Sequence, residues 1–148
     1  MLFRSAPTSS VFSVKTTTGV NASGGTYVAY CFAEIAGFSK FGSYTGNGST
    51  DGPFVYLGFR PKWVLVKVIS TTNDWDLFDS VRDPYNVAGL RLQPNSSGAE
   101  SATISNFDFV SNGFKIRNNT NTTEFNGSGS TYIYAAFAET PFKNALAR

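Results

Sequence analysis

The amino-acid sequence predicts an all-β protein: an antiparallel β-sandwich of the jelly-roll or lectin-like kind, with eight or nine short strands and little helix. The first observation behind this prediction is composition, because 16% of the residues are aromatic and 14 are Gly, which favours strands and tight turns. The second is a series of short apolar runs separated by turns rich in Gly, Asn and Asp. The third is a hydrophobic content of 41% with only 15% charged residues, which distinguishes the 148-residue chain from a disordered one.

The expected strands follow one another at regular spacing. A first pair covers residues 11–15 (VFSVK) and 26–34 (TYVAYCFAE). Cys31, the only cysteine, is expected to be a small buried residue of the second strand that forms no intrachain disulfide. Residues 45–53 (TGNGSTDGP) are a predicted surface loop, and residues 54–59 (FVYLGF) form the next strand. The remaining strands are expected at residues 63–69, 74–80, 89–93, 106–117 and 131–139.

Alternation of side chains gives these strands their orientation. Residues 63–69 (WVLVKVI) are nearly all apolar, as expected for a central strand covered on both faces. Residues 74–80 (DWDLFDS) alternate between two faces, with Trp75 and Leu77 on one and Asp74, Asp76 and Phe78 on the other. Residues 89–93 (GLRLQ) are a short strand that places Arg91 outward.

The last third of the chain predicts a hairpin and a final strand. The hairpin covers residues 106–117 (NFDFVSNGFKIR), and its expected inward side chains are Phe107, Phe109, Phe114 and Ile116. Its turn is Asn112-Gly113, where a positive backbone φ is expected. Residues 131–139 (TYIYAAFAE) form the final strand. In the tail that follows, Thr140 and Pro141 are suited to begin a short helix.

One segment of the chain occurs twice. Residues 26–34 match residues 131–139 without a gap, at an offset of 131 − 26 = 105 residues. This period is the size of a whole small β domain and far longer than a solenoid repeat. The sequence therefore predicts a partial repeat in residues 1–40, packed into the same fold or a neighbour's, and a complete sandwich unit with a short tail in residues 41–148. Each copy of this strand is apolar on both of its faces. A facing sheet can cover only one face, so the other face requires a neighbouring unit or subunit.

The sequence lacks the residues that several classes of enzyme chemistry need. Without histidine the chain cannot form a Ser-His-Asp triad or a Cys-His pair, and no GxxxxGK[ST] phosphate loop occurs. The net charge is +2 and the basic residues are scattered, so nucleic acid is not an expected partner. The sequence shows no signal peptide and no apolar run of membrane length. We expect a non-enzymatic protein with no catalytic residues, no cofactor, no metal and no membrane insertion.

Residues 74–86 (DWDLFDSVRDPYN) contain the candidate binding residues. Exposed Trp, Tyr and Arg side chains are suited to a glycan or a protein partner, which makes the candidates Trp75, Asp74, Asp76, Arg82 and Tyr85. The competing structural interpretation makes Trp75 a core residue and pairs Arg82 with Asp83 at the surface. The Asp side chains would then guard a solvated strand edge. A catalytic carboxylate pair and a cation site built from their oxygens are further alternatives.

Six short motifs follow one another along the chain, in the order YTGNG, LGFRPKWVLVK, DWDLFDS, LQPNSSGAE, GFKIR and TYIYAAFAE. In this order the motifs resemble a repeat of tail-fibre-like and other virion proteins of tailed bacteriophages, and the resemblance covers almost the whole chain. Units of that family recur in tandem and close with a motif like NASGGTYVAYCFAE, which implies that residues 1–40 are similar to the end of a preceding unit. The chain is much shorter than the long fibres, so a capsid-decoration or tail-associated subunit is also compatible.

The resemblance implies a virion structural protein on the particle surface, at the head or the tail. Such a protein acts by oligomeric assembly with other copies of itself and with other virion proteins, and by attachment to the host. The alternative from another class is a lectin-like module that binds a host surface glycan through exposed aromatic residues such as Trp75 and Tyr85. An enzyme acting on polysaccharide would require two facing carboxylates in a groove.

Overall fold

The computed structural model describes residues 7–117 and 122–139. The chain divides into two compact units, Met1–Phe32 and Ala33–Arg148. The division therefore falls within the segment predicted as a partial repeat, residues 1–40. The expected helix in the tail after residue 139 lies outside the described residues.

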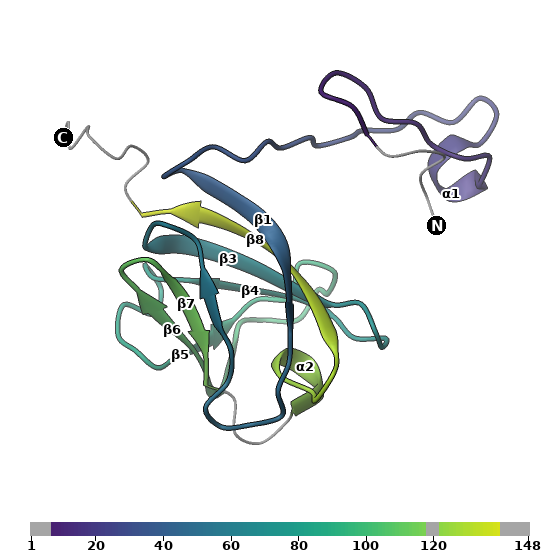
Figure 1. Ribbon diagram of the computed structural model, residues 1–148. Coiled ribbons are helices and arrows are strands. Elements are labelled where there is room, and N and C mark those ends of the chain that lie inside the picture. Colours follow the sequence, from purple (N-terminus) through teal and green to yellow (C-terminus); the bar gives the residue numbers. More distant parts are fainter. Residues whose placement is uncertain (1–6, 118–121, 140–148) are drawn as a thin grey trace. The chain divides into compact units, whose positions relative to one another are not determined.

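The N-terminal unit contains one helical turn, α1 (Thr18–Asn21), and its described residues form no strand (Figure 1). The Tyr27 hydroxyl closes a local loop onto this turn, because it accepts a hydrogen bond from the Ala22 amide and donates one to the Thr18 carbonyl, both at 2.8 Å. The predicted strand pair at residues 11–15 and 26–34 is therefore wrong for this unit. A strand requires a partner for its backbone groups, and composition alone does not supply one.

The apolar side chains of residues 26–34 are correspondingly accessible. Val28 is 78% and Tyr30 84% exposed. Cys31, which was expected to be buried, is exposed as well. A segment with the composition of a core strand thus presents its side chains to solvent.

The second unit is an antiparallel β-sandwich, which confirms the predicted fold class (Figure 1). One sheet has the strand order β1-β8-β3-β4 and the other β2-β7-β6-β5. The strands are β1 (Ser39–Thr45), β2 (Phe54–Tyr56), β3 (Pro61–Val68), β4 (Trp75–Asp79), β5 (Ala88–Arg91), β6 (Ser101–Val110), β7 (Gly113–Ile116) and β8 (Thr131–Ala138). One helical turn, α2 (Thr122–Phe125), precedes β8. The chain passes repeatedly from one sheet to the other, so neither sheet comes from one continuous stretch of sequence.

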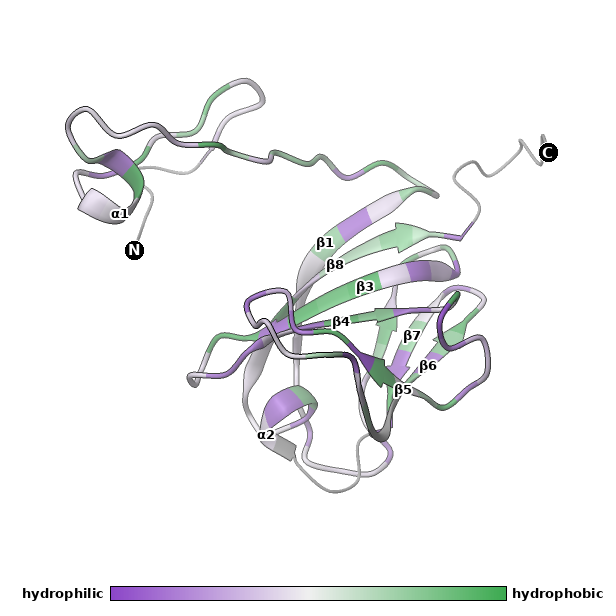
Figure 2. Cartoon of the chain, turned by 180° about the vertical axis from the view of Figure 1, so that it is seen from behind, coloured by the Kyte–Doolittle hydropathy of each residue, from purple (hydrophilic) through white to green (hydrophobic). Residues whose placement is uncertain are grey.

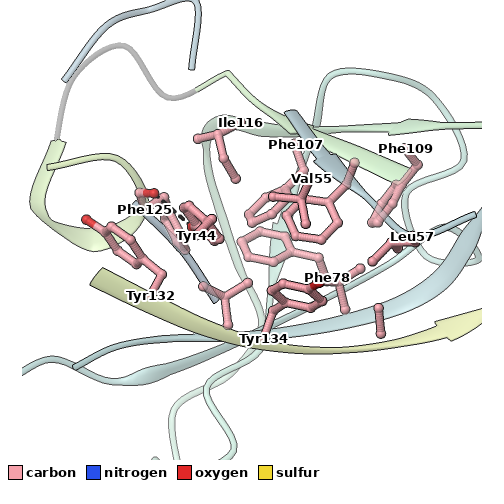
Figure 3. Packing of buried hydrophobic residues seen from close by; sticks show 14 of the residues in the cluster. Tyr44, Val55, Leu57, Phe78, Phe107, Phe109, Ile116, Phe125, Tyr132 and Tyr134 are labelled. Atoms are coloured by element: carbon pink, nitrogen blue, oxygen red, sulfur yellow. Dashed lines mark hydrogen bonds between the residues drawn. The ribbon is translucent and has the colours of Figure 1, made fainter. Parts of the chain in front are cut away.

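The core lies between the two sheets and is rich in aromatic rings (Figure 3). Phe107 is fully buried, and its ring centroid lies 4.3 Å from that of Phe78, 5.5 Å from Phe114 and 5.6 Å from Phe125. The four predicted inward positions of the β6–β7 hairpin are all buried, namely Phe107, Phe109, Phe114 and Ile116. The hairpin and the inward orientation of these side chains are therefore confirmed.

Strand β3 lies between β8 and β4, as predicted for a central strand. Its buried residues are Pro61, Val64, Val66 and Val68. The side chains on its other face are only half-buried, and these are Trp63, Leu65 and Lys67. Within the described part of the chain no second layer packs on this side, so the chain's own strands supply only one of the two expected covers.

The glycines of the YTGNG motif allow the segment that follows β1 to lie in close contact with the segment that follows α2. A Cβ atom on Gly46 would lie 2.3 Å from the Gly127 carbonyl oxygen, so a larger residue would force the backbone to shift. The buried Asn126 side chain donates a hydrogen bond to the Ser49 carbonyl at 2.6 Å. The predicted loop is thus held against the sandwich by glycine and amide contacts.

The turn between β6 and β7 differs from the prediction in its backbone conformation. The described residues with positive φ are Gly24, Gly37, Gly48, Gly58 and Gly129. Asn112 and Gly113 therefore lack the expected conformation. Glycine is needed at position 113 for a steric reason, because a Cβ atom there would lie 2.1 Å from the Val55 carbonyl oxygen of β2.

Candidate functional site

The broadest candidate surface is the face of the sheet β1-β8-β3-β4 that points away from the core, which we call the outer face. Its apolar side chains come from all four strands and are Phe41, Trp63, Leu65, Trp75, Leu77, Ile133 and Phe137. The register places them side by side: Leu65 lies opposite Leu77 and Ala135, and Trp63 lies opposite Phe137. Figure 2 shows hydrophobic colour along much of β3 and β8.

Aromatic contacts organise one end of the outer face. The Phe137 ring lies 5.4 Å from Trp63 and 5.9 Å from both Phe38 and Phe41, each time edge to face. These side chains cover one another in part, and no second layer covers them among the described residues. The predicted apolar second face of residues 131–139 is therefore confirmed. A contiguous apolar surface of this kind is a feature that protein and ligand interaction sites share.

A buried charged cluster surrounds Asp76. This residue is 2% exposed, and its Oδ1 accepts hydrogen bonds from Arg91 Nη1 and Gln93 Nε2, both at 3.4 Å. Arg91 Nη1 also donates to Glu124 at 3.1 Å, so the cluster joins β4, β5 and α2. Burial raises the pKa of Asp76 to about 6, although the positive charge of Arg91 acts in the opposite direction.

This cluster corrects two predictions. Arg91 does not point outward into solvent but reaches inward to two carboxylates, because a buried charge needs a partner. Asp76 does not guard a solvated edge, because it is 2% exposed and bonded within the cluster. Asp74 shares the Gln93 amide, which donates to its Oδ2 at 3.1 Å, and Asn95 donates to its Oδ1 at 2.7 Å. Within the described ranges, no group of three or more His, Cys, Asp or Glu side chains is placed to hold a metal ion.

Arg82 belongs to a different cluster. Its guanidinium forms ion pairs with Asp79 and Glu100. The predicted pair with Asp83 is wrong, because Asp83 Oδ2 instead accepts hydrogen bonds from the amides of Gly89 (2.7 Å) and Leu90 (3.1 Å). Asp83 thereby supports the backbone of β5.

The predicted site residues therefore fall into two groups. Asp74, Trp75 and Asp76 lie together at the start of β4, whereas Arg82 and Tyr85 follow its end. Trp75 is 36% and Tyr85 81% exposed, so the interpretation of Trp75 as a core residue is wrong. Trp75 begins β4 and Tyr85 follows its end, so the two aromatic side chains are separated by the length of this strand.

A pocket of about 310 Å³ lies beside the start of β1, and its lining includes Glu34 and Lys40. The Glu34 carboxylate accepts a hydrogen bond from the Phe41 amide at 3.1 Å. The Lys40 ammonium lies 5.4 Å from the centroid of the Tyr56 ring. Both charged groups of the pocket thus have structural contacts.

The comparisons with known proteins give one match. A family model described as Domain of unknown function (DUF7483) matches residues 1–141, a range that includes both copies of the repeated segment. No curated protein and no solved structure matches the chain significantly. In the part of the chain that the structure describes, no helix is long and apolar enough to cross a membrane.

Proposed function

Because the chain belongs to the DUF7483 family, whose description assigns no function, we propose its role from its own residues: a non-enzymatic structural subunit on the surface of a tailed-bacteriophage particle. It acts by oligomeric assembly, at the head or the tail. The observation that carries the proposal is the outer face, an apolar surface that spans all four strands of one sheet. The order of motifs that resembles the repeats of tail-fibre-like proteins supports the particle type.

The occupant that we propose for the outer face is a second copy of the chain. Lys67 and Asp79 lie at opposite ends of the paired segment of β3 and β4, with Leu65 and Leu77 between them. The Asp79 carboxylate is already paired with Arg82 and accepts a hydrogen bond from the Val81 amide, and the Lys67 ammonium donates to the Val68 carbonyl at 2.7 Å. A contact between two copies would therefore rest on the leucine pair and the apolar side chains around it. The outer face is therefore apolar in its centre, which is what the core of a two-fold interface requires.

We expect the chain to be a component of purified particles of the phage that encodes it. Particles banded in a density gradient should contain its peptides in mass spectrometry, and antibodies against the sandwich should label intact particles. A phage-encoded replication enzyme is the matched control and should be absent from the same band. Presence in the infected-cell lysate together with absence from the particles would exclude the structural role.

A second candidate function is that of a lectin-like module for a host surface glycan. The specific observation in its favour is Trp75, which is exposed beside the Asp74 carboxylate and the Asn95 amide. An aromatic ring next to polar groups offers a sugar both an apolar face and hydrogen-bond partners.

If this candidate is correct, Trp75→Ala should abolish binding of host polysaccharide in isothermal titration calorimetry and leave thermal unfolding almost unchanged. Tyr85→Ala is the matched control, since Tyr85 is a more exposed aromatic residue beyond the other end of β4 and its loss should leave binding intact. Equal binding by the wild-type chain and by Trp75→Ala would exclude a glycan site at Trp75.

A further inference from the structure

We propose that the loop between β4 and β5, residues 80–87, inserts Tyr85 into the pocket beside the start of β1 of a second copy of this chain. The inference rests on the assembly role proposed above and adds a contact at one end of the sandwich, separate from the outer face. Each copy has one such loop and one such pocket, so two copies can fill each other's pockets around a two-fold axis.

The loop is anchored by its polar side chains and leaves its apolar ones accessible. Asn86 binds the backbone of Phe109 on both sides, because its amide donates to the carbonyl at 3.1 Å and accepts from the N–H at 2.9 Å. Asp83 accepts two backbone hydrogen bonds from β5. By contrast, Val81 is 64% and Tyr85 81% exposed. The apolar side chains are therefore available to a partner.

The backbone of the loop is also fixed at its start. Asp79 Oδ1 accepts hydrogen bonds from the amides of Val81 at 3.0 Å and Arg82 at 2.8 Å. The Arg82 guanidinium pairs with Asp79 and Glu100. A side chain on a preorganised loop loses little conformational freedom on binding, and tyrosine is one of the residues that contribute most to protein interfaces. Tyr85 therefore has the properties of an interface anchor.

The pocket has the size and the lining for one aromatic side chain. Its volume is about 310 Å³, and a cavity of about 150 Å³ is enough to hold benzene. Leu57 and Phe59 supply an apolar wall, since they are only 5% and 8% exposed. The Glu34 carboxylate uses Oε1 for a backbone amide, and within the described part of the chain its Oε2 accepts no hydrogen bond. This oxygen can accept one from a tyrosine hydroxyl.

The charges beside the pocket and in the loop are complementary. Among the described residues, the Lys40 ammonium at the pocket pairs with no carboxylate and lies over the Tyr56 ring. Within the same ranges Asp83 pairs with no cation, because its hydrogen bonds come from backbone amides. Insertion of Tyr85 brings Asp83, two residues before it, toward the Lys40 of the other copy. Complementary charges of this kind orient an interface.

The strand register places the loop and the pocket at the same end of the sandwich but at opposite edges of one sheet. Paired positions form one row across the four strands, namely Ser39, Phe137, Trp63 and Asp79. Ser39 lines the pocket, and the loop follows Asp79. The row spans three strand spacings, about 14 Å. A two-fold axis parallel to the strands and through the middle of this row therefore brings the loop of each copy to the pocket of the other.

A photoreactive side chain at position 85 tests the contact directly. Tyr85 is replaced by p-azidophenylalanine, which keeps the size of the ring, and this copy is mixed with an isotope-labelled copy of the natural sequence. Irradiation should give a covalent dimer of two 16.0 kDa chains. Mass spectrometry should locate the labelled end of the link in residues 34–40 or 57–59. The same replacement of Tyr30, which is 84% exposed, is the matched control and should give no link to these residues.

A second variant blocks the pocket. Ala36 is an exposed residue of the pocket lining, and Ala36→Trp in the labelled copy should reduce the yield of the link at least tenfold while leaving thermal unfolding almost unchanged. Ala99→Trp is the matched control, because Ala99 is equally an exposed alanine but lies outside the lining. The yield with Ala99→Trp should equal that of the natural sequence.

Several results would overturn the proposal. The first is the absence of a covalent dimer at the highest soluble concentration. The second is a link within the photoreactive copy itself, which would show that Tyr85 reaches its own pocket. Links that map to the outer face, or an unchanged yield with Ala36→Trp, would show that the pocket does not receive Tyr85.

The two proposals fail separately. Links to the pocket together with absence of the chain from phage particles would keep the Tyr85 contact and exclude the virion role. Presence in particles without such links would exclude the Tyr85 contact and leave the virion role standing.

Discussion

Replacing Phe107 by Ala is expected to lower the free energy of unfolding by about 3–5 kcal/mol. Phe107 is 0% exposed and lies in contact with the rings of Phe78, Phe114 and Phe125. Truncation removes the apolar area of one ring and leaves a cavity between three others, which come from β4, β7 and α2. Since these elements are held by their own backbone contacts, the cavity can collapse only in part.

Chemical denaturation followed by tryptophan fluorescence measures this loss. Phe54→Ala is the matched control, because Phe54 of the edge strand β2 is 47% exposed and should lose much less. If both substitutions reduced stability equally, the aromatic cluster between the sheets would not be the main source of stability.

The sandwich could be predicted from the sequence because its local patterns agree with its tertiary contacts. Alternation with a period of two residues assigned Phe107 and Phe114 to the core and placed Asp76 and Phe78 on one face of β4. The turn before β7 was found at the right place, although its backbone conformation was not, because the close approach of Gly113 to Val55 depends on a strand distant in sequence.

The N-terminal strands could not be predicted correctly because strand formation depends on a partner. Residues 26–34 and 131–139 have nearly the same sequence, yet only the second copy lies between two neighbours, β1 and β3. Local sequence specifies that the first copy is able to form a strand, and the contacts of the folded chain decide whether it does.

Of the candidate surfaces, the one formed by local sequence patterns could be predicted, and the one formed by residues distant in sequence could not. The apolar outer face was visible in the composition of the strands themselves. The charged cluster was not, because Asp76, Arg91 and Glu124 lie far apart in sequence and meet only when the two sheets and α2 pack together. A lone Arg91 within a short apolar strand was the available indication of an inward charge.

The second large effect is expected from Asp76→Asn. Compared with the wild type, this variant should gain stability when the pH is raised from acidic to neutral. The pKa of Asp76 is about 6 in the folded chain because of burial, compared with 3.8 for an ordinary Asp. Since the folded pKa is the higher one, protonated Asp76 contributes stability that is fully present below pH 3.8 and is lost as the pH rises through about 6. The difference between these two pKa values corresponds to about 3 kcal/mol of unfolding free energy.

Asn keeps the shape of the side chain and stays neutral, so the variant should not lose this contribution. The difference in unfolding free energy between variant and wild type should therefore shift by about 2 kcal/mol in favour of the variant between pH 4 and pH 7, because a small part of the contribution is already lost at pH 4. Measuring the difference at both pH values cancels any constant cost of the Asn amide, such as a poorer hydrogen bond to Arg91 or Gln93.

Asp51→Asn is the control with the opposite sign. Asp51 is exposed, and its hydrogen bond with Lys115 lowers the pKa of its carboxyl group. The stability that Asp51 contributes is therefore present above its unfolded pKa and lost as the pH falls, so this variant should become slightly less stable at neutral pH. A wild-type chain that gains stability between pH 4 and pH 7 as strongly as Asp76→Asn would mean that Arg91 and Gln93 compensate fully for the burial of the Asp76 charge.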